Sequence, residues 1–256
     1  MNPVCSLSFL FAFGCLIGWG MEALFRRGYS GEWINPGFLT GPALPMYGFG
    51  LCLLYLLALL GENFSLGNLL IDRILLIILM TVCLTLLEYV AGLIFIKKMK
   101  TQLWDYSNEK WNFQGIICFK YSLLWAVLCA VYLFFIHPFI GNILKWFSAH
   151  LSFLFFLGMF YGIFLIDLCN SFRLVSKIKA FAEENDILIR YEELKTNIRN
   201  TAKEQKEKYR YLFAFSSRVP LMEHLKKYLS LIQAFALDKQ EKEDAENDGR
   251  DGFDRS

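Results

Sequence analysis

The stretch at residues 35–50, NPGFLTGPALPMYGFG, lies between two apolar runs and decides how the chain can fold. It carries three of the chain's six prolines, each of which fixes φ and lacks a backbone donor. Its four glycines admit backbone conformations that other residues avoid. Because Phe38, Leu39, Leu44 and Tyr47 are interspersed among them, the pattern predicts irregular backbone at membrane depth, which only protein or a water-filled cavity can cover. We interpret it as a structured lead-in to the second membrane helix.

The composition is that of a membrane protein. The 256 residues are 55% hydrophobic with a mean hydropathy of +0.38, and the apolar residues are gathered in runs. Five runs have the length of about 20 residues that a membrane helix needs; they cover residues 5–25, 43–60, 74–96, 116–136 and 151–169. We therefore expect an all-α protein whose residues 1–170 form about five transmembrane helices.

The basic residues set the expected orientation. No Lys or Arg precedes the first run, whereas Lys97, Lys98, Lys100 and Lys110 follow the third and the segment after Asn170 is rich in both. Low and high counts alternate from one connection to the next. The positive-inside rule then predicts a multi-pass plasma-membrane protein with its amino terminus outside and its carboxyl-terminal tail in the cytoplasm.

The tail divides into two parts. Residues 171–237 have apolar positions at helical spacing, which predicts one long helix from residue 172 to about 215 that continues the fifth membrane helix. A second amphipathic helix is expected from Pro220 onward, with Lys226 and Lys227 opposite its apolar face. Residues 238–256 are acidic and have few apolar side chains, so we expect them to be disordered.

Three carboxylates in the apolar part are candidates for function. Glu22, Glu88 and Asp167 all fall in the predicted cytoplasmic half, and Glu88 lies ~12 Å inside its helix end. A carboxylate in hydrocarbon costs at least about 2.5 kcal/mol, so such groups usually face the bundle interior or a wet cavity. They could line a polar cavity for a ligand. Alternatively, they could form structural ion pairs, for which Arg26, Arg27 and Lys120 are possible partners.

A second polar group lies in the connection between the third and fourth runs. Trp104-Asp105-Tyr106-Ser107 is followed by Asn112 and Gly115, and Trp and Tyr are well suited to the headgroup level. Asp105 could cap a helix, accept hydrogen bonds from Arg26 or Arg27, or contact a ligand.

Small residues mark places where helices could touch. Gly14 and Gly18 form a GxxxG pair in the first run, as do Gly158 and Gly162 in the fifth. This spacing permits close backbone approach, within one chain or between copies.

Several sequence signatures are absent. The sequence has no GxxxxGK[ST], so it does not bind nucleotide through a P-loop, and it lacks HExxH and GxSxG. The seven cysteines form no CxxC pair or zinc spacing and are expected to be buried hydrophobes. We expect no cofactor, no metal and no nucleic-acid partner. Five runs show no inverted repeat, which disfavours a stand-alone repeat-built transporter.

The motifs together resemble those of the bacterial membrane family of putative ABC-transporter type IV permeases. The resemblance covers roughly residues 14–130 and rests on these matches: Gly18-Trp19, Glu22, Asn35, Gly37-Phe38-Leu39, Gly41-Pro42, Pro45, Tyr47-Gly48, Gly50, Glu88-Tyr89, Trp104-Asp105-Tyr106-Ser107, Asn112 and Gly115. Pro36 and Ile117 stand where the family usually has basic residues. Any role of those charges is absent here or has moved to Arg26, Arg27 or Lys120.

The resemblance implies a permease-like membrane subunit, and three functions follow as hypotheses. The first is the membrane subunit of a transporter whose ATPase is a separate chain. The second is a membrane-embedded enzyme acting on a lipid or lipid-linked substrate through Glu22, Glu88 and Asp105. The third is a scaffold that recruits a cytosolic partner, and self-association stays open. No catalytic residue is assigned. The candidate binding residues of a polar cytoplasmic-side cavity are Glu22, Arg26, Arg27, Asn35, Tyr47, Glu88, Trp104, Asp105, Tyr106 and Asn112.

Overall fold

The computed structural model describes residues 3–31, 33–63, 67–150, 152–204 and 221–234. The chain divides between Tyr191 and Glu192 into two compact units. Within the described residues the first unit holds five helices that are long and apolar enough to cross a membrane. The prediction of an all-α fold with about five such helices is confirmed.

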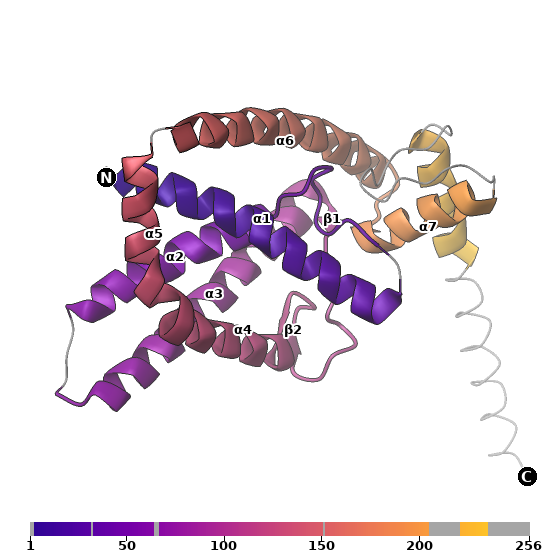
Figure 1. The fold of residues 1–256 in the computed structure, drawn as a ribbon. Coiled ribbons are helices and arrows are strands. Elements are labelled where there is room, and N and C mark those ends of the chain that lie inside the picture. The colour runs from indigo at the N-terminus through magenta and orange to yellow at the C-terminus, as the bar shows by residue number, and fades with distance from the viewer. Residues whose placement is uncertain (1–2, 32, 64–66, 151, 205–220, 235–256) are drawn as a thin grey trace, which may run out of the picture. The chain divides into compact units, whose positions relative to one another are not determined.

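Helices make up most of the first unit (Figure 1). They are α1 (Pro3–Ser30), α2 (Pro45–Glu62), α3 (Leu69–Met99), α4 (Phe119–Val131), the π-helical segment η1 (Tyr132–Ile136), α5 (His137–Ala149) and α6 (Ser152–Glu184). Four two-residue strands form two small ladders, β1 (Thr101–Gln102) with β4 (Ile189–Arg190), and β2 (Asn112–Phe113) with β3 (Ile117–Cys118).

Local sequence explains where the helices begin. Pro45 opens α2, and Leu44 before it has the extended conformation that a following proline favours. Asn68 caps α3, because its side-chain oxygen accepts from the backbone N–H groups of Leu70 and Ile71 at 3.0 and 3.4 Å.

The helices α1 and α2 approach each other through glycines. A Cβ on Gly14 would stand 2.8 Å from the Cα of Gly48, and one on Gly18 would stand 2.3 Å from the Cβ of Tyr47. Neither position has room for a side chain. The GxxxG pair of α1 is therefore an internal contact, whereas a Cβ on Gly158 or Gly162 of α6 would meet nothing within 4 Å.

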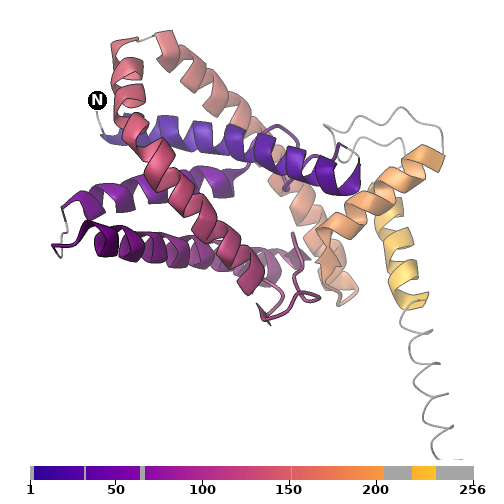
Figure 2. The same ribbon diagram turned by 60° about the horizontal axis from the view of Figure 1, so that its bottom comes forward.

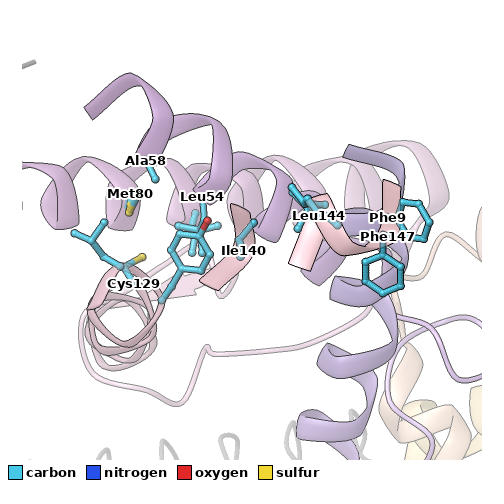
Figure 3. Packing of buried hydrophobic residues seen from close by; sticks show 12 residues of the cluster. Phe9, Leu54, Ala58, Met80, Cys129, Ile140, Leu144 and Phe147 are labelled. Carbon is cyan, nitrogen blue, oxygen red and sulfur yellow. The ribbon is translucent and has the colours of Figure 1, made fainter. Parts of the chain in front are cut away.

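The main core lies among α1, α2, α3, α4 and α5. Figures 1 and 2 show α1, α2 and α3 running side by side, and α4 packs against α3. Figure 3 shows the side chains that these helices contribute, with Leu54, Met80 and Cys129 at one end. At the other end the rings of Phe9 and Phe147 stack with centroids 4.7 Å apart.

The predicted irregular lead-in to the second helix is present and is covered by protein. Leu39 is 2% exposed and packs in a second cluster with Cys15 and Phe164. Gly37 has a φ of +75°, and a Cβ there would meet Leu44 at 2.4 Å. Helix α1 supplies a hydrogen-bond acceptor to the end of this loop, because the Leu44 N–H donates to the Cys15 carbonyl at 3.0 Å.

The sequence predicts that the fourth run ends at residue 136, but the helix does not end there. It continues through η1 and α5 as one span, Phe119–Ala149, of 31 residues. Pro138 stands in the first turn of α5, where its missing N–H is tolerated, and the π-helical turn before it changes the hydrogen-bond register. His137 steadies the junction, with Tyr132 Oη and Glu62 Oε1 each 3.2 Å from one of its ring nitrogens.

The tail helix does continue the fifth membrane helix, but it is not one helix to residue 215. Helix α6 ends at Glu184 because Asp186 adopts the left-handed conformation, with a φ of 49°. The Ile187 N–H then donates to the Ala182 carbonyl. This is the 6→1 hydrogen bond of a Schellman motif. The chain runs on through β4 into α7 (Tyr191–Glu204).

The second unit begins in α7 and includes a helix over residues 221–234. Its interior contains Leu194, Ile198 and Leu225, and the Tyr228 hydroxyl donates to Glu193 Oε2 at 3.0 Å. Lys226 and Lys227 are exposed, as the predicted amphipathic face requires. The predicted start at Pro220 and the predicted disorder of residues 238–256 lie outside the described residues.

The glycines of α1 are in close contact with α2, whereas those of α6 are not, and this difference can be tested by substitution. We expect Gly18→Val to lower the free energy of unfolding by about 1–3 kcal/mol or to prevent folding, because the added carbons overlap the Tyr47 side chain. Gly158→Val is the matched control, since its site is open within the chain. Thermal unfolding in detergent measures both. Equal losses in the two variants would contradict an internal contact at Gly18.

Candidate functional site

Glu22 lies one helical turn after Gly18, on the face of α1 that meets α2. Its Oε2 accepts from the Tyr47 hydroxyl at 3.1 Å, and its Oε1 lies 3.0 Å from Nε of Arg26. The carboxylate and the guanidinium are each about a quarter exposed. The spacing of four residues places the ion pair on one helix face. Glu22 is therefore held by a cation from its own helix and a donor from the next.

Glu88 is the most deeply buried carboxylate of the membrane helices, with 3% of its surface exposed. Its Oε1 accepts from the Tyr106 hydroxyl at 3.2 Å, and its Oε2 accepts from the Trp125 indole N–H at 2.8 Å. Within the described residues it has no ion pair. The Lys120 ammonium, a candidate partner from the sequence, pairs instead with Glu109 at 2.8 Å.

The two glutamates belong to one group of side chains. The ring of Tyr47, bonded to Glu22, lies 5.8 Å from the ring of Trp125, which is bonded to Glu88. Glu22 and Glu88 are also close enough to interact electrostatically. We call Glu22, Tyr47, Glu88, Tyr106 and Trp125 the glutamate centre. It joins α1, α2, α3, α4 and the connection after α3.

Tyr106 links this centre to the connection between α3 and α4. Its ring stacks on Tyr121 with centroids 4.5 Å apart. Burial, together with the negative charge of Glu88, raises the pKa of Tyr106 well above its usual range. The phenol thus stays protonated at neutral pH and remains a hydrogen-bond donor to Glu88.

The connection is a folded hairpin, which we call the WDYS loop (residues 101–118). Gln114 and Gly115 both have positive φ, 56° and 66°, as the central residues of a type I′ turn do. Asn112 Nδ2 donates to the carbonyls of Ser107 and Glu109 at 3.1 and 2.9 Å. A Cβ on Gly115 would meet Ser107 Oγ at 2.6 Å, so the motif glycine is a steric requirement.

Trp104 fixes this hairpin to α3. Its indole N–H donates to the Ile116 carbonyl at 2.8 Å, and its ring lies beside Gly92. A Cβ on Gly92 would stand 2.4 Å from Ile116 Cγ2. The loop is therefore packed closely onto the helix that carries Glu88, one turn away.

Asp105 bonds within the hairpin and to Arg190, and so holds the hairpin together. Its Oδ1 accepts from the Ser107 N–H at 2.9 Å and from the Ser107 hydroxyl at 2.5 Å, and its Oδ2 lies 3.3 Å from Nη2 of Arg190. Partial burial raises the pKa of Asp105, but these hydrogen bonds and the Arg190 charge outweigh it and lower the pKa below its usual value. Arg190, not Arg26 or Arg27, is the cation at this carboxylate.

Asn35 and Asp167 support the irregular loop before α2. Asn35 is 3% exposed; it accepts from the Trp19 indole N–H at 2.6 Å and donates to the carbonyls of Leu39 and Thr40. Asp167 of α6 accepts from the Thr40 N–H at 3.2 Å, the Gly41 N–H at 2.9 Å and the Thr40 hydroxyl. Asp167 is thus fully engaged as an anchor for the loop backbone.

The predicted site residues thus fall into two sets. The structure brings Glu22, Arg26, Tyr47, Glu88 and Tyr106 together. The others make separate contacts: Asn35 in the loop before α2, Trp104, Asp105 and Asn112 in the hairpin, and Arg27, whose guanidinium lies 4.5 Å from the ring centroid of Trp33. Trp125 and Arg190 were not among the predicted site residues. No cluster of three or more metal-ligating side chains occurs in the described part of the chain.

Comparison with known proteins identifies the family. A family model described as putative ABC-transporter type IV matches residues 9–172, more than half of the chain. The chain belongs to this family. The match includes both glutamates, the loop before α2 and the WDYS loop, and with the five apolar helices it fits a multi-pass membrane protein. No curated protein and no solved structure matched the chain.

The hydrogen bond between Trp125 and Glu88 can be measured by a double-mutant cycle. Trp125→Phe should lower the free energy of unfolding by about 1–3 kcal/mol, because it leaves a buried carboxylate oxygen without its donor. In a Glu88→Leu background the same change should cost clearly less. Trp111→Phe, at an 80% exposed position, is the control. Additive effects of the two core changes would show that this bond does not couple them.

The pKa of Asp105 gives a pH dependence with a defined sign. Since its pKa is lowered in the folded hairpin, the ionised carboxylate stabilises that hairpin above its ordinary pKa of about 3.9, and this is lost as the pH falls through the folded pKa. Asp105→Asn should therefore speed amide hydrogen exchange in residues 101–118 at pH 7. It should also remove the acid-induced increase below about pH 4. Unchanged exchange at pH 7 would refute this role.

Proposed function

We propose that the chain is the membrane subunit of a transporter and that its ATPase is a separate chain. The observation that carries this proposal is the convergence of Glu22 and Glu88, from two membrane helices, into one group of side chains, in which the ring of Tyr47, bonded to Glu22, lies beside the ring of Trp125, bonded to Glu88. Carboxylates at such depth are expensive and usually mark a pathway for ions or substrates. Family membership supports the same class of function.

The glutamate centre has the chemistry of a binding site for a polar solute or a coupling ion. It contains the carboxylate oxygens of two glutamates together with the rings of Tyr47 and Trp125, whose centroids are 5.8 Å apart. Glu22 has Arg26 as its cation, but Glu88 has no ion pair among the described residues. Binding of a proton or a cationic group at Glu88 would neutralise this buried charge.

The WDYS loop provides the mechanical connection to a partner. Tyr106 lies in the loop and bonds directly to Glu88, so a displacement of the loop breaks or strengthens that hydrogen bond. At the same time the loop exposes Trp111 and Phe113, at 80% and 54% of their surfaces. An ATPase that docks on these rings could move the loop and so change the hydrogen bond between Tyr106 and Glu88.

The proposal includes location and orientation. The sequence has no P-loop, which supports an ATPase on a separate chain. The positive-inside pattern supports a plasma-membrane protein whose WDYS loop and tail face the cytoplasm. There they are accessible to a cytosolic ATPase.

Purification of the tagged protein from its native membrane in mild detergent tests the partner. We expect a near-stoichiometric ATPase by mass spectrometry, and we expect Trp111→Ala to release it. Phe139→Ala, an exposed aromatic of α5, is the control. The absence of any ATPase from the wild-type preparation would contradict the proposal.

The role of Glu88 is tested in vesicles that contain the purified complex. ATP-driven uptake, followed for a panel of solutes by mass spectrometry, should fall about tenfold or more in Glu88→Gln, because a charge-assisted interaction of about 1.5–3 kcal/mol is lost. Glu62→Gln, at an exposed carboxylate near His137, should transport normally. Full uptake by Glu88→Gln in an intact complex would exclude Glu88 from the pathway.

A further inference from the structure

A cavity away from the glutamate centre lies between the ends of α3 and α6. Its volume is ≈ 430 Å³. Lys97 and Lys100 line it from α3 and its cap, and Glu183 and Asp186 line it from the end of α6 and the turn that follows. Ile96 and Leu188 supply apolar wall. Neither the transport proposal nor the family comparison assigns a role to it.

Backbone pairing fixes the two sides of this cavity. Strands β1 and β4 pair in parallel, Thr101 with Ile189, and the Ile189 N–H donates to the Lys100 carbonyl at 3.2 Å. Thr101 and Ile189 are both completely buried. The left-handed residues Lys100 and Asp186, with φ of 50° and 49°, turn the chain at the end of each helix. The walls are therefore part of the folded unit and not of a loose loop.

The cavity holds charges of both signs that do not neutralise one another. Glu183 pairs with Lys179 at 3.5 Å along its own helix. Within the described residues, Lys97, Lys100 and Asp186 have no ion pair, which means that no ammonium nitrogen of the two lysines lies within 4.0 Å of a carboxylate oxygen. A simple anion or cation would match only half of this lining. A molecule with one negative and one positive group matches both halves.

The position of the cavity in the membrane narrows the identity of that molecule. The apolar run of α3 ends at Ile96, and Lys97 follows, which is where a membrane helix meets the headgroups. Val90 and Ile94, four residues apart on the same helix, are 50% and 44% exposed below it. A charged group in the cavity can thus be continuous with a chain that lies along an apolar helix surface.

We infer that this cavity binds the headgroup of a phospholipid that carries a phosphate and a primary ammonium, as phosphatidylethanolamine does. Lys97 and Lys100 donate to the phosphate oxygens. Asp186 and Glu183 accept from the ammonium. The volume lies within the range of about 300–1,000 Å³ that small-molecule sites occupy. A trimethylammonium group lacks N–H donors and a glycerol headgroup lacks the cation, so neither satisfies the carboxylates.

The test uses the full chain in vesicles that contain equal fractions of phosphatidylethanolamine, phosphatidylcholine and phosphatidylglycerol. The protein is extracted in mild detergent, and native mass spectrometry identifies the lipid that remains bound. We expect phosphatidylethanolamine to be retained preferentially, and Lys97→Gln/Lys100→Gln to reduce this retention about tenfold or more, because charge-assisted hydrogen bonds are lost. Lys98→Gln is the control, since Lys98 lies between Lys97 and Lys100 in the sequence but does not line the cavity.

Asp186→Asn is the second variant, because asparagine also accepts the left-handed conformation and the helix cap is kept. It should reduce retention of phosphatidylethanolamine but not the unfolding temperature in phosphatidylcholine. Equal retention of all three lipids, or an equal loss in Lys98→Gln, would overturn the inference. Displacement of the bound lipid by millimolar soluble phosphoethanolamine, but not by phosphocholine, would support the inference, because both groups that the cavity recognises belong to the headgroup.

Discussion

The close contact between α1 and α2 is the constraint on which the rest of the first unit depends. Lipid tails are as apolar as leucine, so helices in a bilayer are held together by packing and hydrogen bonds, not by escape from water. Gly14, Gly18 and Gly48 leave room for the two backbones to meet. Because Tyr47 then lies on Gly18, its hydroxyl reaches Glu22 one turn further along α1. The packing of Tyr47 on Gly18 therefore also forms the hydrogen bond between Tyr47 and Glu22.

A second requirement, that polar groups within apolar surroundings be satisfied, explains much of the remaining motif. The loop before α2 lacks regular hydrogen bonds, and Asn35 and Asp167 supply them from its own start and from α6. Each does so with side-chain atoms that a smaller or apolar residue would not have. Asn35 and Asp167 thus hold the backbone of the loop that leads into α2, the helix that carries Tyr47.

The sequence was sufficient for the features that depend on composition and local chemistry. The apolar runs predicted the membrane helices, and the prolines and glycines of residues 35–50 predicted a protein-covered irregular segment. The ion pair of Glu22 with Arg26 follows from a spacing of four on one helix. Asn185-Asp186, where α6 ends, was a turn signal inside a segment that otherwise has helical periodicity, and the expectation of one long helix overlooked it.

The features that depend on distant segments could not be predicted in this way. Trp125 stands in an apolar run where a tryptophan has no visible polar purpose, and only the packing of α4 on α3 brings its N–H to Glu88. Arg190 reaches Asp105 because β4 pairs with β1. Strands of two residues are too short to show the alternating pattern by which a strand is predicted from sequence. The lining of the cavity beside that ladder likewise comes from segments more than 80 residues apart.

The π-helical segment has a consequence for how the chain tolerates insertions and deletions. An α-helix turns by about 100° per residue, and η1 closes the bond from His137 to Tyr132 with one residue more than an α-helical turn needs. Because the π-helical turn spreads its rotation over this extra residue, loss of one residue from Tyr132–Ile136 would restore a regular helix and leave α5 close to its present phase. Ile140, Leu144 and Phe147 would stay on the core side. A deletion at the start of α5, where no extra residue is available, would instead rotate these three side chains by about 100° away from the core. A single-residue deletion is therefore better tolerated in η1 than in α5.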